Sequence, residues 1–89
     1  PGSQPAMEIA LTGDDWDEAT RHADALEVFA SADPFAWADY FIRRARLITR
    51  IGRGDRSARD ELARLRVDGA EAGFRPSLVL MDRALAALA

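Results

Sequence analysis

Apolar residues recur at three- and four-residue spacing along most of the chain, which is the pattern of amphipathic helices. The pattern predicts a short helix over residues 5–11 and longer helices over residues 15–33, 34–51, 57–72 and from 76 to the end. Residues that favour strands are few and scattered. We therefore expect an all-α fold, with a short N-terminal helix ahead of the longer ones.

The helix over residues 15–33 has boundary signals at both ends. Asp14 or Asp15 can cap its free N–H groups, and Asp33 fits the N-cap of the following helix, with Pro34 at the first position of that helix. Its apolar face consists of residues that share one side at helical spacing: Trp16, Ala19, Ala23, Leu26 and Ala30. This face predicts packing against a neighbouring helix.

The helix over residues 34–51 is apolar on two sides. One apolar stripe consists of Trp37, Ala38, Phe41, Ala45 and Ile48. A second stripe consists of Tyr40, Leu47 and Ile51. The remaining polar strip consists of Asp39, Arg43, Arg46 and Arg50. Two apolar stripes predict a helix that lies between neighbours on both sides.

The last two helices also have apolar faces. In the helix over residues 57–72 the inward face includes Gly69, where we expect another backbone to pack closely. Gly73 can adopt the left-handed conformation that ends a helix, and Phe74 can fold back over the last turn. The final helix should bury the residues that share its apolar side: Leu78, Met81, Leu85 and Leu88.

One plan occurs twice along the chain. Gly13-Asp14 precedes a helix that leads to Pro34, and Gly54-Asp55 precedes a helix that leads to Pro76, with the two glycines 41 residues apart. A period of this length is typical of helical-hairpin repeats, whose units bury their apolar faces against neighbouring units.

The segment Gly13-Asp14-x-Trp16-x-Glu18-Ala19, with Pro34 beyond it, resembles the second helix of a tetratricopeptide repeat. Three residues stand where the first helix of that family has its aromatic, small and large packing residues: Phe41, Ala45 and Ile48. Arg44 replaces the leucine that the family has. The resemblance implies tetratricopeptide-like helical hairpins that form a fragment of a right-handed solenoid.

A longer string is similar to the C-terminal repeat tails of bacterial class III adenylate/guanylate cyclases and of related multidomain regulators. It comprises Asp14 to Glu27, Trp37-Ala38-Asp39-Tyr40-Phe41 and Gly52 to Arg56. The similarity covers about residues 7–88, and this stretch contains no cyclase catalytic motif. The resemblance implies a regulatory repeat tail of a larger bacterial signalling protein, and not an enzyme.

Composition narrows the possible chemistry. The chain has no cysteine, which excludes disulfides and thiolate metal sites. All twelve basic residues are arginine, and lysine and asparagine are absent, which indicates the codon bias of a GC-rich bacterial genome. No apolar run approaches the ~20 residues of a membrane span, and no signal peptide is visible. We therefore expect a cytoplasmic location and no membrane partner.

The first residues have the composition of a processing remnant. Pro1-Gly2-Ser3 is typical of the sequence that a protease leaves when a tag is removed. We therefore expect residues 1–5 to be a disordered tag remnant, residues 6–89 to form a single domain, and the chain to be part of a longer protein.

Charge is distributed unevenly along the chain. Residues 1–42 carry nine acids and one arginine, whereas residues 43–89 carry eleven arginines and six acids. This asymmetry predicts an electric dipole along the sequence, which favours steering and head-to-tail contacts.

The polar residues give little indication of catalysis. His22 is the only histidine, and one imidazole without cysteine ligands is more typical of a partly buried structural residue than of a zinc site. Helix capping and the helix dipole explain the acids of residues 14–18. A turn between two helices explains the tripeptide Arg53-Gly54-Asp55. We expect no catalytic residues, no metal, no cofactor and no small-molecule ligand.

We therefore predict a non-catalytic module that binds a protein partner or self-associates. The truncated start of the chain should leave Trp16, Ala19 and their neighbours without a covering helix, and an apolar patch of this kind should attract a partner. The candidate contact residues are Trp16, Trp37, Tyr40, Phe41, Arg43, Arg44, Arg46 and Arg50. The alternative is a nucleic-acid-binding domain that uses the arginine band of residues 43–66, which contains nine arginines and three acids.

Overall fold

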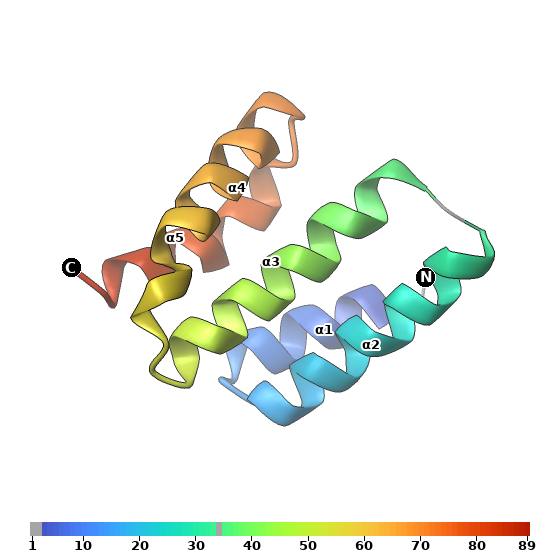
Figure 1. Cartoon of the computed structure of the whole chain (residues 1–89), viewed down its shortest axis with the longest axis horizontal. Coiled ribbons are helices and arrows are strands. Elements are labelled where there is room, and N and C mark those ends of the chain that lie inside the picture. The colour runs from blue at the N-terminus through green and yellow to red at the C-terminus, as the bar shows by residue number, and fades with distance from the viewer. Residues whose placement is uncertain (1–2, 34) are drawn as a thin grey trace.

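The computed structural model describes residues 3–33 and 35–89, and all the regular structure in these residues is helical. The prediction of an all-α fold is confirmed. The helices are α1 (Ser3–Thr12), α2 (Trp16–Ala32), α3 (Ala36–Gly52), α4 (Arg59–Glu71) and α5 (Leu78–Ala86). Two single 3₁₀ turns, η1 (Arg56–Ala58) and η2 (Arg75–Ser77), lead into α4 and α5 (Figure 1).

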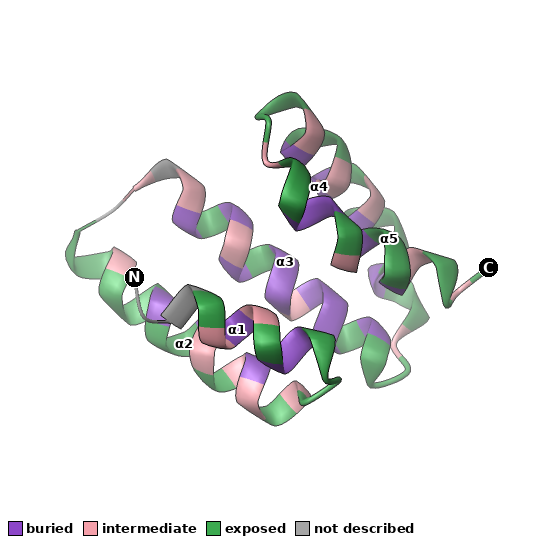
Figure 2. Cartoon of the chain, turned by 180° about the vertical axis from the view of Figure 1, so that it is seen from behind, coloured by how far each residue is buried: buried purple, intermediate pink, exposed green. Residues whose placement is uncertain are grey.

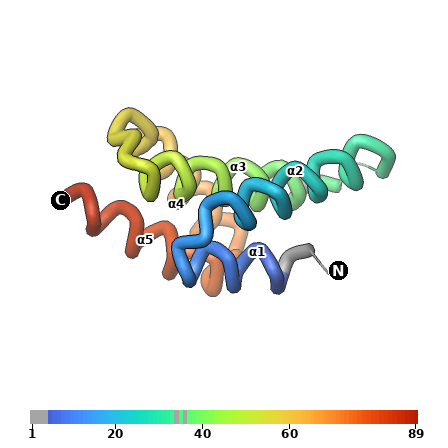
Figure 3. Tube along the Cα trace, turned by 90° about the horizontal axis from the view of Figure 1, so that it is seen from below, coloured from blue at the N-terminus to red at the C-terminus, as the bar shows by residue number. Residues whose placement is uncertain are grey.

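Helix α3 is the centre of the molecule and contacts all four other helices. Buried residues accordingly gather on α3 and on the sides of its neighbours that face it (Figure 2). Helices α1 and α5 lie on the same side of α3 (Figure 3). They are joined where the Arg83 guanidinium of α5 donates to the carbonyl oxygens of Leu11 and Thr12 at the end of α1. The second stripe of α3 and the C-terminal part of its first stripe are therefore buried, whereas Trp37 and Phe41 of the first stripe stay partly exposed.

Helix α1 is a structural part of the domain. Met7 and Leu11 are fully buried, and α1 packs along α2, whose Ala19 and Ala23 have no exposed surface. The expectation that the apolar face of α2 lacks a covering helix is therefore wrong. A short helix is unstable by itself, but here two large side chains bury it against α2 and α3.

The expected boundary of a disordered N-terminal remnant also differs from the structure. Residues 3–5 were expected to be disordered, but they belong to α1, which begins at Ser3. Residues 1 and 2 lie outside the described residues.

The start of α2 follows local rules. The Asp15 side chain accepts the backbone N–H of Glu18 and caps the helix, as expected. Asp14 has a left-handed backbone with φ of 56° and turns its carboxylate toward Arg83 of α5.

The start of α3 does not follow the prediction. Asp33 ends α2, where its N–H donates to the Phe29 carbonyl, and the residue that precedes α3 is Phe35. The predicted role of Asp33 as the N-cap of α3 is therefore wrong, and Pro34 lies outside the described residues. The Phe35 side chain makes no capping hydrogen bond, and its ring packs on Phe29 and Trp37.

Gly69 faces a side chain and not another backbone, which corrects the expectation. A Cβ atom at Gly69 would lie 2.2 Å from the hydroxyl oxygen of Tyr40. The Tyr40 hydroxyl in turn lies 2.6 Å from the Ser77 hydroxyl and donates to the Met81 sulfur at 3.4 Å. Gly69 therefore makes room for a buried ring that joins α3 to α4 and α5.

The turns before α4 and α5 largely follow the sequence pattern. Asp55 accepts the backbone N–H of Ser57 at the start of η1. Gly73 has the expected left-handed conformation with φ of 83°, and Phe74 packs half-buried against the core. No helix in the described residues is both long and apolar enough to cross a lipid bilayer.

Candidate partner-binding surface

Aromatic rings form a continuous series around the N-terminal end of α3, which we call the aromatic ladder. Its first rings are Phe29 and Phe35, with centroids 5.9 Å apart, and Trp37 follows at 4.4 Å from Phe35. Phe41 lies 5.8 Å from Trp37 and 5.7 Å from Phe74. Tyr40 packs beneath, 5.0 Å from Phe41 and 5.2 Å from Phe74. The ladder therefore joins the end of α2 to the turn between α4 and α5 by way of α3.

Most of the ladder is accessible from outside. Phe29 is 56% exposed, and four other rings are half-buried: Phe35, Trp37, Phe41 and Phe74. Aromatic side chains in this state cost free energy in water and are enriched where proteins bind one another. The ladder is therefore the best candidate for a contact surface.

A surface groove lies at each end of the ladder. The first groove has a volume of about 350 Å³ and is lined by Glu8, Phe41, Gly73, Phe74, Pro76 and Ser77. The second has a volume of about 260 Å³, lies between α2 and α3, and is lined by Glu27, Ala30, Ser31, Phe35, Ala38, Asp39 and Ile42. Both grooves combine apolar walls with carboxylates.

Arg44 lies in the interior and not on the surface. Its guanidinium donates to both carboxylate oxygens of Glu8 at 2.6 and 2.8 Å and to the carbonyl oxygen of Ser77 at 2.9 Å. It also lies over the Phe41 ring at 5.7 Å from the centroid. Arg44 is fully buried and Tyr40 nearly so, and neither presents the surface that contact with a partner requires. Both link α3 to the helices around it.

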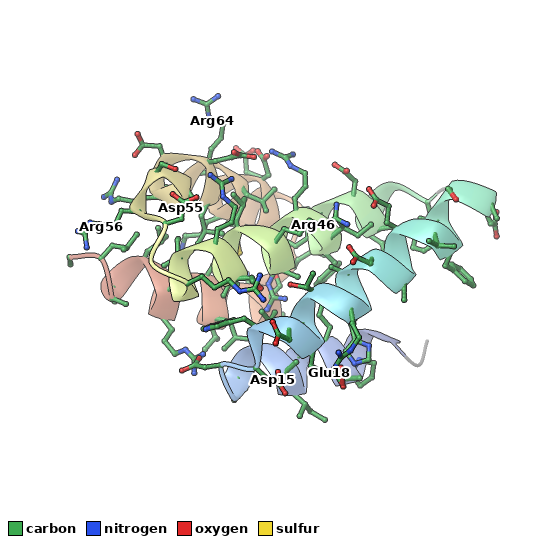
Figure 4. The ribbon with its side chains drawn as sticks, turned by 60° about the horizontal axis from the view of Figure 1, so that its bottom comes forward. Asp15, Glu18, Arg46, Asp55, Arg56 and Arg64 are labelled. Atoms are coloured by element: carbon green, nitrogen blue, oxygen red, sulfur yellow. The ribbon has the colours of Figure 1, made fainter. Side chains whose placement is uncertain are left out.

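The other arginines of the predicted contact set are half-exposed and lie beside carboxylates. Arg46 donates to Asp24 at 2.8 Å and to Glu27 at 3.0 Å, and Figure 4 shows it where α3 passes α2. The hydrogen bond with Glu27 raises the pKa of the Arg46 guanidinium and lowers the pKa of the Glu27 carboxyl. This pair therefore stays charged over a wide pH range.

Two more arginines on α3 follow the same pattern. Arg43 lies 3.9 Å from Asp39 and 3.6 Å from Glu61, and Arg50 donates to Asp55 at 3.0 Å. Hydrogen bonds from Ser57 first, and from Arg50 second, lower the pKa of the Asp55 carboxyl. These arginines therefore contribute to contacts between neighbouring segments.

Most of the remaining arginines of the band also contact neighbouring residues. Arg53 donates to Asp17 at 2.5 Å, and Arg56 donates to the carbonyl oxygen of Leu88 at 2.8 Å. Arg59 pairs with Asp60, and Arg66 pairs with Asp82. Arg64, by contrast, projects away from α4 (Figure 4). Carboxylates thus offset much of the positive charge that the sequence concentrates in residues 43–66.

Trp16 does not join the other predicted contact residues. Its ring lies over Gly52, where an added Cβ atom would come within 2.1 Å of it. It lines a separate groove of about 430 Å³ together with Asp14, Ile48, Ile51, Gly52, Arg83, Ala84 and Ala87. The structure therefore brings Trp37 and Phe41 together and places Trp16 at the other end of α3.

Three ladder residues are missing from the predicted contact set: Phe29, Phe35 and Phe74. The sequence contained a signal that Phe29 is exposed, because this residue lies off the apolar stripe of its helix. Phe35 and Phe74 lie in turns, where helical periodicity says nothing about burial. Within the described residues, His, Asp and Glu side chains form no group of three suited to a metal ion.

No family model, curated protein or solved structure matches this chain.

Proposed function

We propose that this protein is a non-catalytic module that binds a protein partner or a second copy of itself through the aromatic ladder. The observation that carries the proposal is the ladder itself, a continuous set of half-exposed rings with an apolar groove at each end. Trp and Phe side chains are enriched in protein interfaces relative to the rest of the surface.

We propose further that the helices pack as tetratricopeptide-like hairpins, α1 with α2 and α3 with α4, as in a regulatory repeat tail of a larger bacterial signalling protein. The turns that follow Gly13 and Gly54 support this proposal, because an aspartate in each turn caps the next segment by accepting a backbone N–H: Asp15, one residue beyond the Gly13-Asp14 pair, and Asp55. Contacts of α3 with both α1 and α5 also support it, because the first helices of consecutive repeats contact one another in such solenoids.

Nucleic-acid binding through the arginine band is the second candidate. Phosphate binding requires guanidinium groups that are free to leave their partners, whereas Arg46 and Arg53 donate to carboxylates on α2 and Arg44 is buried. We therefore expect no retardation of a DNA or RNA fragment in a gel shift at low salt. Retardation that weakens steeply with salt would favour this second function.

Amide NMR spectra of the ¹⁵N-labelled chain test the proposed function. A dilution series reports self-association, and titration with amphipathic helical peptides of basic, acidic and neutral sequence reports binding of a partner. We expect at least one of these series to shift the amides of the ladder, residues 29–33, 35–41 and 74. If neither dilution nor any peptide shifts them, the ladder is not a binding surface.

A pair of variants tests whether the ladder is responsible for such binding. Phe29→Ser removes a ladder ring that is 56% exposed, and Val67→Ser removes an apolar side chain on α4 that is 52% exposed. Both variants should fold, because both residues face the solvent. We expect Phe29→Ser to weaken the association and Val67→Ser to leave it unchanged.

A further inference from the structure

We propose that the groove between α2 and α3 binds a basic amphipathic segment of a partner protein, with apolar residues in the groove and an arginine or lysine against its carboxylates and the ladder rings. This inference rests on the proposed function and specifies the chemistry of the partner. It depends on the lining of the groove, the charges around it and the rings beside it.

The charged residues that line the groove are all negative. Its apolar walls are Ala30, Phe35, Ala38 and Ile42, and the charged residues that line it are Glu27 and Asp39. Phe35 also belongs to the ladder, and its ring packs on the rings of Phe29 and Trp37. An apolar side chain and an adjacent cation would both find complementary partners at this site.

The charges around the groove leave an acidic excess. Arg46 bridges Glu27 and Asp24, and Arg43 is shared between Asp39 and Glu61. The Asp39 side chain is 78% exposed, and its nearest guanidinium nitrogen lies 3.9 Å away, beyond hydrogen-bond distance. Its carboxylate oxygens can therefore accept hydrogen bonds from a guanidinium or ammonium group of a partner.

The rings beside the groove favour a cation over an anion. The faces of Trp and Phe rings carry negative partial charge and attract a guanidinium or ammonium group within about 6 Å. At the far end of the ladder the charged residue that lines the other groove is Glu8, whose carboxylate is already bonded to Arg44. An acidic peptide would therefore meet like charge at the groove between α2 and α3.

Two designed helical peptides of identical apolar pattern test the inference, one with arginine and one with glutamate at every polar position. A third peptide with glutamine at these positions tests apolar binding alone. Each is titrated into the ¹⁵N-labelled full chain. We expect the arginine peptide to shift the amides of residues 27–42 and to bind at least about tenfold more tightly than the other two peptides.

Asp39→Asn and Asp60→Asn form a matched pair of variants. Each aspartate lies in the first turn of its helix, beside an arginine, and is 78% or 94% exposed. Both changes remove one negative charge from the molecule, but only Asp39 lines the groove. We expect Asp39→Asn to weaken binding of the arginine peptide about threefold to fivefold and Asp60→Asn to change it less than about twofold.

Several outcomes would overturn the inference. Equal weakening by Asp39→Asn and Asp60→Asn would show attraction to net charge and not to the groove. Tighter binding of the glutamate or glutamine peptide at the ladder would refute the basic partner while the proposed function stands. Shifts at the ladder on concentration alone, with no peptide bound, would identify a second copy as the occupant. If nothing shifts the ladder amides, the proposed function fails as well.

Discussion

Gly69 and Gly52 each lie against an aromatic ring from a different helix, at positions where a Cβ atom would clash. At Gly69 the ring belongs to Tyr40, which is buried and hydrogen-bonded to Ser77. At Gly52 the ring belongs to Trp16, which is half-exposed. The two sites differ in how freely the ring can move away.

We predict that Gly69→Ala destabilises the protein although alanine favours helix. The helix-propensity gain is ~1 kcal/mol, whereas overpacking costs ~1–3 kcal/mol. Because Tyr40 is enclosed, the upper part of that range applies and the net loss should be ~2 kcal/mol. Gly52→Ala should cost less, since Trp16 can turn outward. Urea denaturation of both variants checks this order, and a more stable Gly69→Ala protein would contradict it.

Arg44 and Glu8 form an ion pair with unequal burial, because the arginine is fully buried and Glu8 is partly exposed. We predict that Glu8→Leu destabilises the protein by ~3 kcal/mol, since it leaves a buried guanidinium without its carboxylate. Arg44→Leu should cost less, because the exposed Glu8 carboxylate can be hydrated. Denaturation midpoints of the two single variants and the double variant measure the difference. A larger loss for Arg44→Leu would show that packing of the long arginine side chain matters more than its charge.

At the scale of the element, α1 shows how tertiary contacts stabilise a helix of ten residues. A segment of this length is marginal in isolation. Its stability in the domain comes from Met7 and Leu11 in the core, from the Glu8 bond to Arg44, and from Arg83, which satisfies the carbonyls at its C-terminal end.

We predict that Met7→Ala destabilises the protein by ~2–5 kcal/mol, because it leaves a cavity between α1 and its neighbours. Ile9→Ala on the same helix removes an exposed side chain and should change stability by less than ~0.5 kcal/mol. Thermal denaturation followed by circular dichroism distinguishes them. Equal effects of the two substitutions would mean that α1 does not pack on the core in solution.

Helix boundaries show the reach of local sequence rules. Asp15 and Gly73 act as predicted because a cap and a left-handed turn depend on a few adjacent residues. The start of α3 was not predictable in this way. Phe35 precedes that helix because its ring packs on Phe29 and Trp37, and this contact depends on how α2 and α3 lie together.

At the scale of the whole molecule, folding brings the acidic first half against the arginine-rich second half. Arg44 bonds to Glu8, Arg46 to Asp24 and Glu27, Arg53 to Asp17, and Arg83 to Asp14. Many of the opposite charges of the two halves therefore pair with one another within the same molecule. Fewer charges remain for the head-to-tail contacts between molecules that the sequence suggested.

A further ion pair, between Arg66 and Asp82, predicts a loss of stability in acid. The hydrogen bond from Arg66 lowers the folded-state pKa of Asp82 below its usual 3.8, so the folded state binds its proton less readily than the unfolded state. The stability that this pair contributes to the folded state is thus fully present above about pH 4 and is lost as the pH falls through the lowered pKa of Asp82. Urea midpoints measured from pH 6 to pH 2 should fall in that window.

Asp82→Asn serves as the test of this assignment, with Asp60→Asn as its charge-matched control. We expect Asp82→Asn to lower stability at neutral pH and to flatten the decline in acid, because asparagine does not titrate. The control should keep the decline of the unmodified protein. An unchanged decline in Asp82→Asn would show that other carboxylates cause the acid sensitivity.

The sequence by itself determined the helices and most of their buried faces, because helical periodicity is a property of adjacent turns. The same periodicity placed Trp37 and Phe41 on an apolar stripe, and both were also named as contact candidates; in the structure they are half-buried. Only the tertiary structure decided that Arg44 is buried, that the rings of Phe29, Phe35 and Phe74 join into one ladder, and that most of the arginine band bonds to carboxylates. Each of these depends on contacts between helices or turns, such as Arg44 with Glu8, 36 positions away. The spacing of residues along the chain does not specify which helix faces become neighbours. The packing of the other helices around α3 decides this.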